Sequence, residues 1–195
     1  MFEIIKHLPV VTVLVRHPLD QQITYNFDII DQIYDNYVAN NFLPIVELAF
    51  MPYDLVPNTY KSDYDLNGWK HPPNDYQKWY NLVRTFALHL SERYGKQIEN
   101  WYFEVWNEPD IGAYWLGSVE DYCKLYDYTV EAIKSVNQNL KIGGPAVTNG
   151  GGNFLNQFLQ HITSGTNHAN HQNGTQIDFI SFHSKGKFSS RFIFL

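Results

Sequence analysis

Short, almost continuous runs of apolar residues recur along the chain and predict buried strands. Four such runs are present, at residues 43–50, 101–106, 141–145 and 177–183. The first run is closed by Pro52, a residue that interrupts the pairing of strands. Runs of this length are typical of strands that are covered on both faces of a sheet.

Between these runs, apolar residues recur at spacings of three and four, as on one face of a helix. Segments with this spacing lie at residues 27–38, 79–90, 122–133 and 154–162. The second segment is followed by Gly95, a common helix terminator, and the third is preceded by Ser118-Val119-Glu120-Asp121, which resembles a capping box. The repeated strand–helix units predict an α/β fold with a parallel sheet and helical crossovers.

A parallel sheet of this kind is either an open, doubly wound sheet or part of an eight-stranded barrel. Four strand–helix units, with a further candidate near Val10, amount to about half of a barrel, which usually needs ~250 residues. A nucleotide-binding open sheet is disfavoured, because Gly150-Gly151-Gly152 has neither the dinucleotide spacing nor the lysine of a phosphate loop.

Composition narrows the class of protein. The 195 residues include 14 Lys and Arg against 20 Asp and Glu, a net charge of −6 that argues against nucleic acid as a partner. The single cysteine, Cys123, excludes an internal disulfide framework, and the eight histidines show no metal-ligand spacing, so we expect no metal and no cofactor. No apolar run approaches the ~20 residues of a membrane span, and Met1 to Val15 lacks the pattern of a signal peptide.

Aromatic residues make up 16% of the chain, which fits either a core filled with rings or a cleft for a carbohydrate or another flat ligand. Composition leaves these two alternatives open.

Two carboxylates belong to this part of the chain: Glu104 lies within the second apolar run, and Glu108 follows its end. Four residues apart on an extended segment, they would lie ~13 Å from each other. The carboxyl groups of a glycosidase pair lie roughly 5–5.5 Å or 6.5–9.5 Å apart, so these two are not expected to form such a pair. We expect Glu108 to be the exposed, reactive group at the strand end, and Glu104 to be buried and hydrogen-bonded beneath it.

Asn107-Glu108-Pro109 at the end of a parallel strand, within the context of residues 103–110, resembles glycoside hydrolase family 39. Further matches occur in the right order at residues 25–27, 44–52, 72–79, 143–145 and 178–183. The resemblance covers residues 24–190, whereas residues 1–23 match poorly. It implies that residues 1–195 form one partial catalytic domain, an incomplete (β/α)8 TIM barrel containing about strands 2 or 3 to 6.

The resemblance also implies a retaining hydrolase that cleaves O-glycosidic bonds of a carbohydrate substrate. Glu108 would be the general acid/base, Asn107 would contact the 2-hydroxyl of the sugar, and His183 and Lys185 would also bind it. Met51-Pro52 and residues 72–76 are similar to β-xylosidases, whereas Gly165-Thr166-Asn167 and His183-Ser184-Lys185-Gly186 are similar to α-L-iduronidases. The choice between β-xyloside and α-L-iduronide stays open.

In this family the nucleophile is a second glutamate on the seventh strand, which would lie beyond residue 195. We therefore expect residues 1–195 alone to be inactive and to self-associate through open sheet edges. The alternative is a catalytically dead, sugar-binding remnant. Relatives are lysosomal or secreted, which leaves the compartment of this chain unknown.

Overall fold

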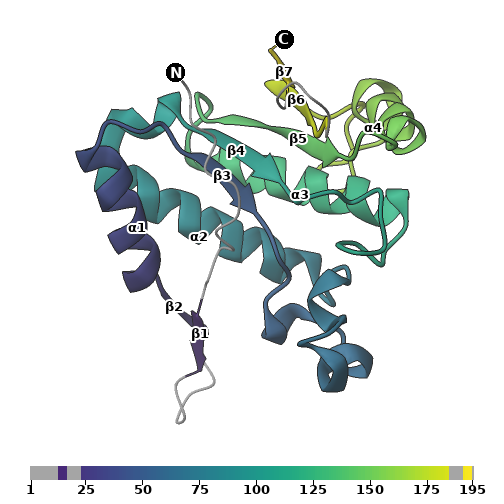
Figure 1. The fold of residues 1–195 in the computed structure, drawn as a ribbon, viewed down its shortest axis with the longest axis horizontal. Helices are drawn as coiled ribbons and strands as arrows, with labels where there is room; N and C mark the ends of the chain where they lie inside the picture. The colour runs from purple at the N-terminus through teal and green to yellow at the C-terminus, as the bar shows by residue number, and fades with distance from the viewer. Residues whose placement is uncertain (1–12, 17–22, 185–190, 195) are drawn as a thin grey trace.

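The computed structural model describes residues 13–16, 23–184 and 191–194. Its main sheet has five strands in the spatial order of the sequence, and four of them are parallel (Figure 1). The strands are β3 (Ile45–Leu48), β4 (Tyr102–Val105), β5 (Lys141–Val147), β6 (Phe179–Phe182) and β7 (Arg191–Phe194). The first four confirm the predicted apolar runs as strands of a parallel sheet.

Four helices flank the sheet at the positions that the apolar spacing predicts. They are α1 (Asp28–Ala39), α2 (Tyr76–Tyr94), α3 (Val119–Val136) and α4 (Gly152–Ser164). Helix α2 ends at Gly95, which has a φ of +56°, and α3 begins with the predicted capping box between Ser118 and Asp121. Short 3-10 helices occupy Tyr53–Leu55, Asn58–Asp63, Gly68–Lys70 and Gly95–Asn100. None of the helices in the described ranges is long and apolar enough to cross a membrane.

The two faces of the parallel strands differ in chemistry. Val46, Phe103 and Ile142 belong to the core, and α2 and α3 run side by side along the sheet (Figure 1). Residues that are paired in register on parallel strands point to the same face, so Glu47 lies beside Glu104 on the opposite face. We call this the inner face and define it by Glu47, Glu104, Gly143 and Phe179.

Gly143 has a specific packing role on the inner face. A Cβ at this position would lie 2.8 Å from the ring of Phe179 and 2.1 Å from its carbonyl oxygen. The missing side chain lets the Phe179 ring reach across β5 to Tyr102 on β4, with ring centroids 5.3 Å apart. This close packing joins β4 and β6 across β5 at their N-terminal ends, and the predicted site residues follow the C-terminal ends of the same two strands.

Both ends of the chain add pairings that the apolar pattern did not predict. Strands β1 (Val13–Arg16) and β2 (Ile23–Asn26) pair antiparallel in a separate two-stranded sheet, and the unit expected near Val10 lies outside the described residues. Strand β7 pairs antiparallel with β6, because the few residues between them are too short for a parallel crossover. The edges of the main sheet are therefore β3 and β7.

Candidate active site

The chain turns sharply where β4 ends. Trp106 and Glu108 have φ values of +67° and +45°, a conformation that side-chain-bearing residues seldom adopt. The Trp106 indole N–H donates to the carbonyl of Tyr114 (3.0 Å), and the Glu108 N–H donates to the carbonyl of Ala146 on β5 (3.2 Å). Because the extended segment ends at Val105, the ~13 Å separation expected between Glu104 and Glu108 on a straight strand does not apply.

Glu108 and His183 meet above the end of β5. Nδ1 of His183 lies 2.6 Å from Oε1 of Glu108, and the His183 N–H donates to the carbonyl of Val147 (2.7 Å). The side chain of Glu108 is only 4% exposed, so the expectation that it would be exposed is wrong. The imidazole of His183 comes from a strand two positions away in the sheet, and an apolar pattern along one strand does not predict this contact.

Asn107 is buried beside this pair without a hydrogen bond. The residue is 1% exposed, and neither its amide nitrogen nor its amide oxygen has a hydrogen-bond partner within the part of the chain that the structure describes. An unsatisfied buried amide costs about 1–3 kcal/mol per polar group, so it is retained only where something compensates. An amide nitrogen that can donate and an amide oxygen that can accept, on the residue before Glu108, suit a ligand that carries hydroxyl groups.

A row of carboxyl groups leads along the inner face toward Glu108. Glu47 on β3 pairs in register with Glu104 on β4, and Glu104 is buried as expected. Burial raises the pKa of Glu47 to about 8, with further contributions from the carboxylates of Glu104 and Glu108. Glu47 is therefore mostly protonated at neutral pH and can donate a hydrogen bond. The sequence patterns did not single out Glu47. Its place between Val46 and Leu48 was a usable signal, because alternate residues of a strand point to opposite faces of the sheet.

Asp110 fixes the loop that follows Glu108. Its carboxylate accepts hydrogen bonds from the backbone N–H of Thr148 (2.9 Å) and from the hydroxyl of the same residue (2.5 Å). Gly151 makes room for this contact, since a Cβ there would lie 2.7 Å from a carboxylate oxygen of Asp110. The loops after β4 and β5 are thus locked together, which holds Glu108 in position. The sequence contains Asp110 directly after Asn107-Glu108-Pro109, but nothing in it reveals this partner.

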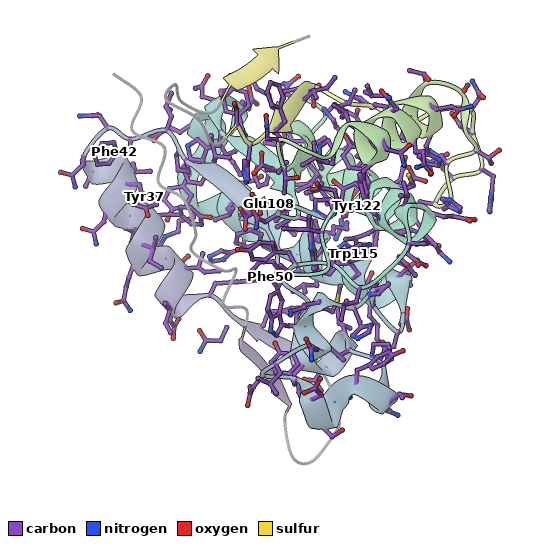
Figure 2. The ribbon with its side chains drawn as sticks, turned by 45° about the vertical axis from the view of Figure 1, so that its right-hand side comes forward. Tyr37, Phe42, Phe50, Glu108, Trp115 and Tyr122 are labelled. Carbon is purple, nitrogen blue, oxygen red and sulfur yellow. The ribbon has the colours of Figure 1, made fainter. Side chains whose placement is uncertain are left out.

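Aromatic side chains form one wall near the end of β4. Phe50, which follows β3, contacts Trp106 edge-on (5.4 Å) and lies 4.5 Å from Trp69 and 5.9 Å from Tyr114 between ring centroids. Figure 2 shows Phe50 and Glu108 in the same central region of the molecule. Phe50, Trp69 and Tyr114 are partly exposed, whereas rings such as Trp101 are buried in the core. Some rings therefore fill the core, as one alternative expects, and these three remain accessible for the other, a carbohydrate cleft.

The structure brings three of the four predicted site residues together. Asn107, Glu108 and His183 lie at the ends of β4 and β6, where a parallel barrel places its chemistry. Lys185 lies outside the described residues. A carboxyl group that is hydrogen-bonded to an imidazole, as in Glu108 and His183, can transfer a proton to or from a hydroxylated ligand, and the neighbouring Asn107 amide can bind that ligand.

Comparisons with known proteins agree with this geometry. The family model described as glycosyl hydrolases family 39 matches residues 3–195. A β-xylosidase from Geobacillus stearothermophilus is 38% identical over 165 residues, which cover 82% of this chain and 30% of that enzyme. An α-L-iduronidase from Mus musculus is 30% identical over 181 residues, covering 87% of this chain and 26% of that enzyme.

A solved structure of a family 39 β-xylosidase from Caulobacter crescentus aligns with a TM-score of 0.73 and 31% identity. The alignment covers 88% of this chain and 36% of that one, so the chain spans about a third of the length of the relatives that it matches. The four parallel strands and their helices are part of a (β/α)8 barrel, as predicted. The chain belongs to family 39 of the glycosyl hydrolases.

Proposed function

We propose that this chain supplies the acid/base side of a retaining glycosidase site that acts on β-xylosides or α-L-iduronides. The observation that carries the proposal is the buried, unpaired amide of Asn107 next to the Glu108–His183 pair. A sugar hydroxyl would satisfy both amide atoms, which nothing else in the described ranges does. The similarity to xylosidases and iduronidases supports the same class of substrate.

Glu108 has two tasks in this mechanism. Its protonated carboxyl donates a proton to the glycosidic oxygen as the bond to the leaving group breaks. The resulting carboxylate then takes a proton from the water that releases the sugar, which restores the starting state. His183, 2.6 Å from Oε1, holds the carboxyl in one orientation throughout.

A retaining reaction needs a second carboxylate about 5–5.5 Å from the first, to attack the anomeric carbon and form the covalent intermediate. From the family resemblance we infer that this nucleophile would belong to a seventh barrel strand, in sequence beyond residue 195. We propose that residues 1–195 bind and protonate the substrate and that the nucleophile comes from this further strand.

The partly exposed rings of Phe50, Trp69 and Tyr114 provide an apolar surface near the acid/base group. Sugar rings have one face rich in C–H groups, which packs on such a surface while the hydroxyls reach polar groups. The rings would therefore hold the sugar or its leaving group, and Asn107 would set its orientation.

The test measures hydrolysis of aryl β-xylosides and aryl α-L-iduronides by the protein as its gene encodes it. Glu108→Gln should lower kcat/KM on substrates with poor leaving groups by about 10²–10⁴-fold and affect activated aryl glycosides much less, since these need little protonation. Added azide should raise kcat of Glu108→Gln on the activated substrates, because the second step then limits turnover and a small anion can replace the water that needs a general base.

Glu92→Gln is the matched control, since Glu92 is exposed on α2. Equal loss on good and poor leaving groups would contradict the acid/base assignment. A protein that binds xylose-type or uronic-acid sugars through Asn107 but hydrolyses neither substrate would instead be the sugar-binding remnant.

A further inference from the structure

A second cluster of ionisable side chains lies outside the Glu108 site, between α3 and α4. It consists of Asp127 on α3, His161 on α4 and His168 in the loop that follows α4. Asp127 is fully buried, and the ligand atoms of the three side chains all lie within 4.8 Å of one another. The proposed glycosidase mechanism uses none of these residues.

The carboxylate of Asp127 is held in place from two sides. The hydroxyl of Thr175 donates to Oδ1 (2.5 Å), and the backbone N–H of His168 donates to Oδ2 (2.8 Å). Nε2 of His161 lies 3.1 Å from Oδ1 and 3.0 Å from Oδ2. Thr175 and the backbone of His168 therefore orient the carboxylate, and its remaining lone pairs face an imidazole nitrogen.

The Gly165-Thr166-Asn167 motif builds the support for this cluster. A Cβ on Gly165 would lie 2.7 Å from Nδ1 of His161, so only glycine allows the imidazole its present position. The side chain of Asn167 donates to Thr175 Oγ1 (3.1 Å) and accepts from the backbone of Ala169 (2.8 Å), which fixes the loop around His168. The motif thus positions two histidines against one buried carboxylate.

We propose that Asp127, His161 and His168 bind a divalent transition-metal ion, with Zn²⁺ as the best fit. Zinc takes imidazole nitrogen and carboxylate oxygen in four-coordinate sites, whereas Mg²⁺ and Ca²⁺ prefer oxygen ligands alone. Three protein ligands leave the fourth position to water. His161 would bind through Nε2, which already faces the carboxylate, and would carry its proton on Nδ1.

The geometry needs only a small adjustment to hold the ion. Two ligand atoms at about 2.1 Å from one zinc ion lie at most ~4.2 Å apart. With the three atoms within 4.8 Å of one another, a movement of the His168 ring on the order of 1 Å closes the site. The ring of His168 packs against that of His161, with centroids 5.4 Å apart.

The bound ion would join α3, α4 and the α4–β6 loop. Asp127 and His161 already link the two helices, and His168 would add the loop as a third element. A cleft of about 440 Å³ lies on the other side of this support and is lined by Thr175 and Asn167 among others. The ion would thus connect three elements of the fold and take no part in the proposed glycosidase chemistry.

The experiment titrates tag-free, chelator-treated protein with Zn²⁺ by isothermal titration calorimetry and with Co²⁺ by visible absorption. We expect one Zn²⁺ per chain, and Co²⁺ bands in the range of tetrahedral nitrogen–oxygen coordination. His168→Ala removes one ligand while leaving the backbone N–H bond to Asp127 in place, and it should weaken Zn²⁺ binding by more than about tenfold. Asp127→Asn should abolish the Co²⁺ bands.

His171→Asn is the matched control. His171 is an exposed histidine of the same loop with a φ of +61°, which asparagine tolerates well, and its replacement should leave Zn²⁺ binding unchanged. The proposal is overturned if the wild-type protein binds no Zn²⁺ at 100-fold molar excess. It is equally overturned if His168→Ala binds as tightly as the wild type while circular dichroism shows both to be folded, since the ion would then bind elsewhere.

Discussion

Replacing Glu47 with glutamine removes a carboxyl group that the fold makes difficult to ionise. Burial on β3, followed by the carboxylates of Glu104 and Glu108, raises the pKa of Glu47 from 4.5 to about 8. In the unfolded chain this carboxyl returns to its ordinary pKa. Between the two values, the folded protein holds a proton that the unfolded chain has already released.

This difference in bound protons determines whether the free energy of unfolding rises or falls with pH. Where the folded state binds more protons, the free energy of unfolding falls as pH rises. The contribution of Glu47 is fully present below pH 4.5 and is lost as pH rises through about 8. At about 1.4 kcal/mol per pH unit, the wild type should lose on the order of 2–3 kcal/mol more than Glu47→Gln between pH 5.5 and pH 7.5.

The measurement is urea unfolding of both proteins at pH 5.5, 6.5 and 7.5, followed by tryptophan fluorescence. Comparing the two proteins at each pH cancels the titration of histidines and other carboxyl groups that they share. Glu92→Gln, which removes an exposed carboxyl on α2, is the matched control for the chemistry of the substitution. Carbon-13 spectra of labelled glutamate carboxyl groups should show one resonance of the wild type titrating near pH 8 and missing from Glu47→Gln.

A difference between Glu47→Gln and the wild type that stays constant to within about 0.5 kcal/mol from pH 5.5 to pH 7.5 would refute the reasoning. A second variant tests the cause of the raised pKa of Glu47. Glu104→Gln removes the larger of the two neighbouring charges that act on Glu47, so the resonance of Glu47 should titrate at a lower pH.

Three further predictions concern the site and the sheet. Asn107→Leu should raise the free energy of unfolding by about 1 kcal/mol, because it replaces an unpaired buried amide, yet it should abolish sugar binding; a loss of stability in urea titrations would contradict this. Lys185→Ala should raise KM for an aryl iduronide much more than for an aryl xyloside, because a lysine ammonium pairs with the uronate carboxylate, and equal effects would favour a xyloside substrate. The exposed edges β3 and β7 should make the 22.8 kDa chain elute from size exclusion as oligomers that grow with concentration, whereas a monomer peak at every concentration would contradict self-association.

Features that depend on neighbouring residues in the chain could be predicted from the sequence. The spacing of apolar residues located α1 to α4, and Gly95 and Ser118 located one helix end and one helix start. Polar residues at strand ends located Glu108 and His183, because parallel strands end on one edge of the sheet, whereas Asn107 was located by the resemblance to family 39. These predictions rest on local periodicity and on a single topological rule.

Features that depend on contacts between distant segments could not be predicted. The buried carboxyl group of Glu108 contacts His183, 75 residues later, and no local pattern indicates this contact. His161 lies 34 residues after Asp127, and the Asp127–His168 contact spans 41 residues, so these separations match no metal-ligand spacing within one element. The antiparallel pairing of β7 depends on the length of the preceding connection rather than on the apolar character of the strand.

The inner face and the end of β4 concentrate groups that cost stability in the absence of a ligand. Asn107 is buried without partners, Glu47 keeps its proton far above its ordinary pKa, and Glu108 has a positive φ. Structural requirements alone would favour apolar residues here, because paired apolar replacements of buried polar groups are often neutral or stabilising. A segment that retains such groups within an otherwise well-packed core is typical of a binding or catalytic site. Substitutions that stabilise the protein at Asn107 and Glu47 should therefore impair its function, and stability measurements locate the site independently of any assay of turnover.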